Sequence, residues 1–164
     1  MNGKQAIKQA LNSTQNILMQ YVSDLSDTDL LVRPAPTANH IAWQLGHLTS
    51  SERGMMAGQE ILPDFPGLPA GFKEQHDKST AAAEPAKGFR SKEEYLGLFK
   101  KVRGGTLALL EKLSDADLDK PSKGSMASYA PTLGELILLQ ANHTMMHAGQ
   151  FTVVRRKLGK PVLF

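Results

Sequence analysis

The sequence contains no cysteine, and this absence excludes several kinds of chemistry at once. Disulfide bonds, zinc sites built from thiolates and a catalytic cysteine nucleophile are all ruled out. An excess of charge of one sign is also nearly missing, since 19 Lys and Arg residues face 16 Asp and Glu residues, for a net charge of +3. So small an excess does not favour nucleic acid as a partner.

Long apolar runs are missing too. No stretch approaches the roughly 18 apolar residues that a membrane-spanning helix needs, and the N-terminal MNGKQAIKQALNSTQN lacks the apolar core of a signal peptide. We therefore expect a cytoplasmic protein that has no membrane partner. Its 164 residues, 41% of them hydrophobic, predict one domain with one core, spanning residues 1–164.

Apolar residues do recur at the i, i+3, i+4, i+7 spacing of an amphipathic helix. The pattern predicts helices over residues 4–25, 37–58, 91–113 and 132–158. Ser91 and Thr132 are each followed three residues later by a glutamate, which predicts a capping box at the start of the last two helices. Thr37 or Asn39 is the predicted N-cap of the second helix. Four long helices in one domain predict an all-α four-helix bundle.

Residues 60–90 are predicted to form a long irregular loop between the second and third helices. Prolines and glycines exclude a continuous helix there, namely Pro63, Pro66, Pro69, Pro85, Gly67, Gly71 and Gly88. Loops of this length are commonly functional lids or mobile segments. A short helical turn around residues 72–80 is compatible with the pattern, and His76 is interpreted as a solvated loop histidine.

Two short tags occur twice in the chain. LSDTDL at residues 25–30 resembles LSDADL at residues 113–118, and APT occurs at residues 35–37 and 130–132. Each tag lies between one long helix and the next. The chain therefore reads as two helix-loop-helix halves, in which the first helix corresponds to the third and the second to the fourth.

Two local features of the helices receive structural interpretations. The run Arg155-Arg156-Lys157 lies at the end of the last predicted helix, where the macrodipole favours cations. Gly104 and Gly105 lie inside the third helix, where each glycine costs about 1 kcal/mol relative to alanine. Close approach by another helix or chain would explain why they are tolerated.

The predicted buried stripe of the last helix includes His143, His147, Gln150 and Phe151, and the two histidines occupy positions where the apolar pattern asks for leucine. Being four residues apart, they lie on one face and can offer two ring nitrogens to one divalent ion. His47 follows Thr37 by ten residues, as His143 follows Thr132 by eleven. At about 15 Å from each helix start, these residues are expected at the same depth of the bundle. His47 is therefore the candidate third ligand.

Several alternatives remain open for these polar residues. A buried histidine is commonly a hydrogen-bonded core residue rather than a ligand. His40 lies about 10.5 Å along the helix from His47 and is expected to be a helix-start residue. His40, Gln44, His47 and Ser51 form a polar line that can be a solvated face or the wall of a pocket. Trp43 is interpreted as a packing residue.

Three protein ligands suggest a catalytic ion, because structural zinc sites are normally closed by four. Such an ion can activate a water or carry a substrate thiolate. Gln44 and Gln150 each lie three residues from a presumed ligand and could orient the imidazoles or the incoming group. Zinc and nickel both suit imidazole ligands.

The motifs around these histidines resemble those of a known family. A tryptophan precedes a histidine in WxxxHL form at residues 43–48, and the last helix carries HxxxHxGQ at residues 143–150, followed by Arg155 and Arg156. With the LSDTDL and LSDADL tags, this pattern resembles the DinB-like (YfiT-like) family of metal-dependent proteins over nearly the whole chain.

The resemblance implies an up-up-down-down four-helix bundle, often a homodimer, in which His47, His143 and His147 hold a divalent ion. It also implies a small-molecule substrate, because characterised relatives transfer or isomerise substrates with low-molecular-weight thiols. No thiol-recognition residue can be mapped onto this chain.

Three functions are therefore compared. The first is a metal-dependent enzyme, either a thiol-dependent transferase or isomerase or a hydrolase. The second is a non-catalytic binding or stress-response module that the ion only stabilises. The third is a helical interaction protein that uses Met145 and Met146, with the histidines as core residues.

Overall fold

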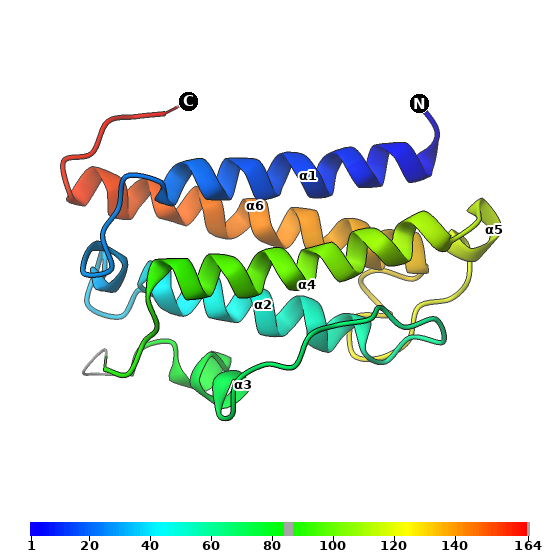
Figure 1. The fold of residues 1–164 in the computed structure, drawn as a ribbon, viewed down its shortest axis with the longest axis horizontal. Helices are drawn as coiled ribbons and strands as arrows, with labels where there is room; N and C mark the ends of the chain where they lie inside the picture. The colour runs from blue at the N-terminus through cyan, green and yellow to red at the C-terminus, as the bar shows by residue number, and fades with distance from the viewer. Residues whose placement is uncertain (84–86, 164) are drawn as a thin grey trace.

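The computed structural model describes residues 1–83 and 87–163, and its long helices are α1 (Gly3–Val22), α2 (Ile41–Met56), α4 (Lys92–Lys112) and α6 (Leu133–Lys157) (Figure 1). Shorter helical elements lie in the connections: η1 (Asp29–Leu31), α3 (Phe72–Gln75), η2 (Lys78–Thr80) and α5 (Asp115–Leu118). Within the described residues no strand forms, and the one isolated bridge pairs Pro121 with Thr132. The predicted all-α four-helix bundle is confirmed.

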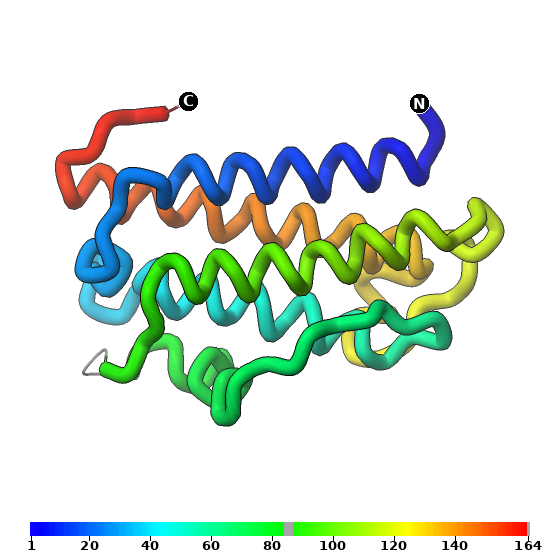
Figure 2. Tube along the Cα trace, in the orientation of Figure 1, coloured from blue at the N-terminus to red at the C-terminus, as the bar shows by residue number. Residues whose placement is uncertain are grey.

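The four long helices pack side by side in two directions. In Figures 1 and 2, α1 and α6 run one way, and α2 and α4 run the opposite way. Around the bundle, in the spatial order α2, α4, α1, α6, the directions are up, up, down and down. Along the chain the order differs, because α2 and α4 are parallel and the connection between them must return along the bundle.

That returning connection is the loop predicted over residues 60–90. Figure 2 shows residues 57–83 running back beside the bundle from the end of α2 toward the start of α4. The predicted helical turn around residues 72–80 is present as α3 and η2. Pro85, one of the prolines on which the loop prediction rested, lies outside the described residues.

The helix caps follow the sequence in three of four long helices. Asn2, Ser91 and Thr132 each form a complete capping box, which confirms the two that were predicted. The prediction of Thr37 or Asn39 as the cap of α2 is wrong, because the ring nitrogen Nδ1 of His40 accepts the Trp43 amide at 3.1 Å. His40 is thus the helix-start residue that was expected.

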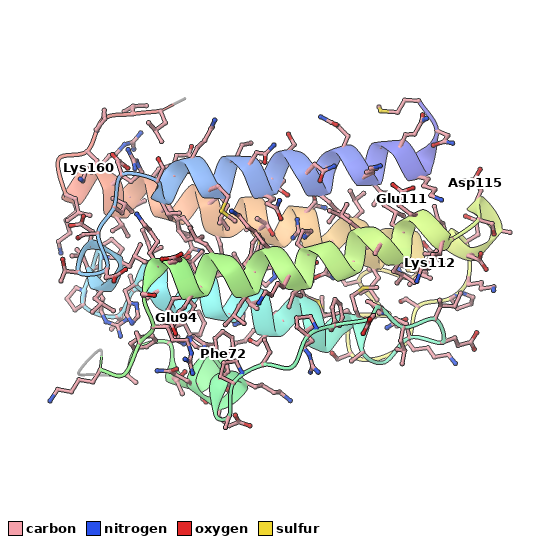
Figure 3. All side chains as sticks on the ribbon, viewed as in Figure 1. Phe72, Glu94, Glu111, Lys112, Asp115 and Lys160 are labelled. Atoms are coloured by element: carbon pink, nitrogen blue, oxygen red, sulfur yellow. The ribbon has the colours of Figure 1, made fainter. Side chains whose placement is uncertain are left out.

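Charged residues sit at the helix ends that the macrodipole favours. Figure 3 shows Glu94 and Lys112 at opposite ends of α4, the first in the opening turn and the second in the last.

The helices are held together by their apolar faces. No helix in the described part of the chain is long and apolar enough to span a membrane.

The glycine at position 105 is required by a close contact with the returning loop. A β-carbon at this position would lie 2.8 Å from the ring of Phe65 and 2.9 Å from the carbonyl oxygen of Asp64. A close approach therefore does occur at Gly105, but it comes from a loop and not from the helix or second chain that was predicted. A β-carbon at Gly104 would meet nothing within 4 Å, and the structure does not explain that glycine.

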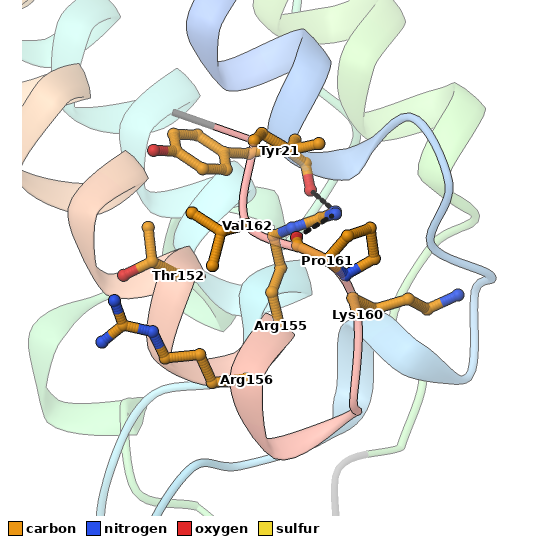
Figure 4. A pocket seen from close by; sticks show the side chains of 8 residues that line it. Tyr21, Thr152, Arg155, Arg156, Lys160, Pro161 and Val162 are labelled. Carbon is orange, nitrogen blue, oxygen red and sulfur yellow. Dashed lines mark hydrogen bonds between the residues drawn. The ribbon is translucent and has the colours of Figure 1, made fainter.

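The end of α6 is tied to the rest of the bundle by Arg155. Its guanidinium pairs with Asp24 and donates hydrogen bonds to the carbonyl oxygens of Tyr21 and Pro161, as Figure 4 shows for the last two. Arg155 is therefore a buried structural cation, while Arg156 and Lys157 are exposed in the last turn as the macrodipole predicts. The neighbouring cavity holds only about 50 Å³.

A buried ion pair crosses the centre of the bundle. Arg103 of α4 is fully buried and forms hydrogen bonds with both carboxylate oxygens of Glu52 on α2, at 2.8–3.1 Å. It also donates to the Thr144 hydroxyl on α6 and to the carbonyl oxygen of Leu11 on α1. One side chain thus fixes the level of all four helices relative to one another.

Replacing Arg103 with methionine is expected to lower the free energy of unfolding by about 3–5 kcal/mol, because it leaves the Glu52 carboxylate buried without its cation. Lys8→Met is the matched control, since Lys8 pairs with Glu111 at the surface, where the change should be below about 1 kcal/mol. Urea denaturation of both variants measures the difference. Equal effects of the two substitutions would contradict a structural role for the buried pair.

Candidate metal centre

Three histidines from two helices converge on one point near the middle of the bundle. His47 comes from α2, and His143 and His147 come from successive turns of α6. One ring nitrogen from each lies within 4.8 Å of the others, and in the described residues no other such group of His, Asp or Glu side chains occurs. The structure therefore brings together the three residues that the sequence singled out.

The convergence follows from where the histidines lie on antiparallel helices. Because α2 and α6 run in opposite directions, equal depths from the two helix starts meet only near the middle of both helices (Figure 1). His47 lies near the middle of α2, and His143 and His147 flank the middle of α6. The equal spacing seen in the two halves of the sequence therefore does produce a common level.

Hydrogen bonds behind the rings fix which nitrogen of each ring faces the common point. Nδ1 of His147 lies 2.7 Å from the amide oxygen of Gln44, whose own amide nitrogen donates to the carbonyl oxygen of Asn39. Nδ1 of His47 lies 3.1 Å from the carbonyl oxygen of His76. Because both partners can only accept, each Nδ1 carries a proton, and Nε2 of each neutral ring presents a lone pair.

The contact between the two α6 histidines fits a shared ion. Nε2 of His147 lies 3.2 Å from Nε2 of His143. Since the His147 nitrogen holds a lone pair, a proton on His143 can satisfy this contact, and a cation can take the place of that proton. Three neutral imidazoles, two of them with the outer nitrogen held by an acceptor, are a donor set that suits zinc.

Burial keeps these imidazoles neutral. Burial is the main reason that the pKa of His143 is lowered to about 4 and that of His147 to about 3, and the neighbouring histidines contribute to both shifts. Burial is also the main reason that the pKa of His47 is lowered, and the positive charge of Lys78 acts in the same direction. The rings are thus neutral at neutral pH, so each has one nitrogen with a free lone pair, as a metal ligand must.

His76 corrects one prediction from the sequence. It was interpreted as a solvated loop histidine, but it is only 1% exposed. Its Nδ1 lies 2.7 Å from the carbonyl oxygen of Phe72, and its Nε2 lies 2.9 Å from the hydroxyl of Tyr95. The ring fits against α2 at Gly46, where a β-carbon would lie 2.2 Å from its Cδ2 atom.

This notch explains both the glycine in α2 and the orientation of His47. With its ring held at Gly46, the carbonyl oxygen of His76 reaches Nδ1 of His47. The only signal in the sequence was Gly46, a glycine inside a helix and next to the candidate ligand His47, for which no neighbouring residue gave a reason. The loop histidine that fills the notch lies thirty residues away and could not be inferred from spacing.

Trp43 packs against the site, as the sequence predicted. Its ring stacks on His47 with centroids 4.7 Å apart and planes 9° apart. Its indole nitrogen donates to the hydroxyl of Thr80 at the end of η2. Trp43 therefore restrains the His47 ring and also holds the returning loop on α2.

Two residues of the polar line on α2, His47 and Ser51, form part of the wall of a pocket, while His40 and Gln44 are buried and are not among its lining residues. Gln44 is buried, and Ser51, whose hydroxyl lies 3.4 Å from Nε2 of His47, lines a cavity of about 540 Å³. His47 and His143 also line this cavity. Its other walls come from α6, from the α3–η2 segment and from residues 125–129.

The two glutamines predicted to assist the site differ in their placement. Gln44 holds His147 through a hydrogen bond from the ring, in agreement with the prediction that it orients an imidazole. Gln150 is exposed, so its assignment to the buried stripe of the last helix is wrong. The next residue of α6, Phe151, is fully buried and continues the buried stripe.

Comparisons with known proteins agree with this geometry. The family model of the DinB superfamily matches residues 10–151. No curated protein matches the chain.

Among solved structures, the chain resembles YfiT from Bacillus subtilis, described as a probable metal-dependent hydrolase with an unusual four-helix bundle topology. Sequence identity is 18%, 96% of this chain and 89% of that chain are covered, and the TM-score is 0.67. A conserved protein from Enterococcus faecalis matches with 15% identity, coverage of 98% and 99%, and a TM-score of 0.69. Likeness at these identities shows the shared fold.

Gly46→Ala is expected to lower the free energy of unfolding by about 1–3 kcal/mol, because the added methyl group displaces a His76 ring that is held at both nitrogens. Gly54→Ala in the same helix is the control, since its β-carbon would meet nothing within 4 Å and alanine should stabilise the helix by up to about 1 kcal/mol. Denaturation curves of both variants test this. Stabilisation by both substitutions would show that the notch is not occupied in solution.

Proposed function

The chain belongs to the DinB superfamily, and from that premise we propose that it is a metal-dependent hydrolase whose divalent ion is held by His47, His143 and His147. The observation that carries the proposal is the convergence of three imidazoles, whose ring nitrogens lie within 4.8 Å of one another beside a cavity of about 540 Å³. YfiT, which shares the fold, is described as a probable metal-dependent hydrolase, and this supports the reaction class.

The donor set suits zinc or nickel, because imidazoles bind both ions and the chain has no thiolate to offer. Three protein ligands would leave a coordination position for a water or a substrate. An ion held by these residues would polarise a substrate oxygen and would lower the pKa of a coordinated water to about 7.

The residues around the site have separate tasks in this proposal. Gln44 and the carbonyl oxygen of His76 keep the protons of His147 and His47 on Nδ1, so that Nε2 remains available. The Ser51 hydroxyl lies at the cavity wall beside His47 and can donate to an oxygen of the substrate or accept from a water. Trp43 and the α3–η2 segment cover the outer side of His47 and limit the access of water.

The open position would also accept a substrate thiolate, as the family resemblance implied. A hydrolase and a thiol-dependent transferase would therefore share the three ligands and differ in the group that occupies the fourth position. The hydrolase is favoured only by the reaction class of a structural relative. Metal content and hydrolysis are therefore measured separately.

Protein purified without a histidine tag is expected to contain close to one equivalent of zinc or nickel per chain. His143→Ala should lose the ion without unfolding, because this residue is half-buried and supplies one of three ligands. Gln150→Ala, an exposed position on the same helix, should keep the full metal content. Elemental analysis measures the ion, and circular dichroism confirms the fold.

The same three proteins should be tested for hydrolysis of a panel of p-nitrophenyl esters with and without added zinc. Ion-dependent hydrolysis by the unmodified protein and by Gln150→Ala, but not by His143→Ala, is the expected result. Bound metal without ion-dependent hydrolysis would favour the non-catalytic module. Metal-free protein whose melting temperature is unchanged by chelation would overturn the metal site itself.

A further inference from the structure

The cavity beside the histidines has an uneven distribution of charge. Two lysines line it, Lys73 on α3 and Lys78 on η2, together with one carboxylate, that of Asp77. Within residues 1–83 and 87–163, neither lysine is paired with a carboxylate. Two ammonium groups thus remain available to a ligand in the cavity.

Asp77 offsets part of this charge. Its carboxylate caps η2 and accepts hydrogen bonds from the backbone amide and the hydroxyl of Ser79, at 2.9 Å and 2.7 Å, which lower its pKa and keep it ionised. Lys78 lowers the pKa of His47 and of His143, while Asp77 raises that of His47. Because one carboxylate faces two ammonium groups, the lysines and Asp77 together leave a net positive charge in the cavity.

The lysines are carried on a segment that is fixed to the bundle. His76 anchors it in the Gly46 notch, and the hydroxyl of Thr80 accepts a hydrogen bond from Trp43. Lys73 precedes His76 by three residues, and Lys78 lies between His76 and Thr80. Their positions relative to His47 are thus set by the same contacts that orient His47 itself.

The cavity also has an apolar side, although Ser50, Ser51, Ser125 and Asn142 contribute polar groups to its lining. Its walls include Met55 near the end of α2, Leu139 and Met146 on α6, and Met126 and Tyr129 in the preceding connection. Met55 lies eight residues beyond His47, which corresponds to about 12 Å along α2. Met146 and Tyr129 are largely exposed, at 63% and 74%, so apolar surface continues to the mouth of the cavity.

We propose that the substrate is an amphiphilic anion, whose negative group is held by Lys73 and Lys78 and whose apolar part lies along Met55, Leu139 and Met126. The assignment rests on the proposed function, because it places the bond to be broken beside the three histidines. A neutral ligand would leave both ammonium groups without a counter-charge, and a cationic one would be repelled by them and by the ion. Flexible methionines suit an apolar part of variable shape.

The probe for this proposal is octane-1-sulfonate, whose head group is a poor metal ligand and whose chain is apolar. 1-Octanol, with the same chain and no charge, is the matched ligand. Isothermal titration of the zinc-loaded protein should show octane-1-sulfonate binding roughly three- to tenfold more tightly than 1-octanol, the gain expected from two exposed ion pairs. The difference should shrink as salt is raised.

The double variant Lys73→Gln/Lys78→Gln should bind the two probes with equal affinity. Lys101→Gln, which removes an exposed lysine of α4 outside the cavity, should keep the preference for the sulfonate. Equal binding by the unmodified protein, or a preference that survives in the double variant, would overturn the proposal.

Zinc content is measured in the same samples, and each titration is repeated on metal-free protein. Absence of zinc would therefore count against the metal site, while the lysine-dependent preference would still be read from the metal-free titration. Loss of that preference with zinc present would count against the anion site alone.

Discussion

The structure depends on the two oxygen acceptors that lie behind the imidazoles. The amide oxygen of Gln44 and the carbonyl oxygen of His76 can accept hydrogen bonds but not donate them, so they hold the protons of His147 and His47 on Nδ1. Burial then prevents a second proton from binding. The Nε2 lone pairs have to face the common point, and the chemistry of the site follows from this arrangement.

Those acceptors are positioned by the packing of the whole bundle. His76 is held by its ring in the Gly46 notch and by hydrogen bonds to Phe72 and Tyr95, while the pair of Arg103 and Glu52 fixes α2, α4 and α6 at one level. A small slip of α6 along α2 would separate the imidazoles. The buried ion pair therefore helps to hold the two helices in the register that brings the histidines together. The packing of the core thus determines the geometry of the histidine site.

Most of the architecture could be predicted from the sequence, because it depends on local patterns. Apolar periodicity located the four helices, and the serine and threonine caps located two of their starts. The spacing of His143 and His147, with the matching depth of His47, predicted the histidine cluster. The start of α2 at His40 was missed because an imidazole cap is not among the usual N-cap residues.

The missed features depend on contacts between distant segments. The burial of His76, its fit at Gly46 and the lysines of the returning loop have no periodic signal, since the loop that carries them is irregular. Arg103 was missed for a related reason: a lone arginine on an amphipathic helix is usually solvated. Gln150 failed in the opposite way, because a helix stripe extended by spacing alone drifts off the buried face.

The most direct test of the account is X-ray absorption spectroscopy of untagged protein loaded with zinc, since the extended fine structure counts imidazole ligands. The account predicts three histidine nitrogens at about 2.0–2.1 Å and one further oxygen ligand from water. A spectrum with one imidazole or none, or a protein that takes up no zinc, would contradict the convergence of His47, His143 and His147 on a single ion.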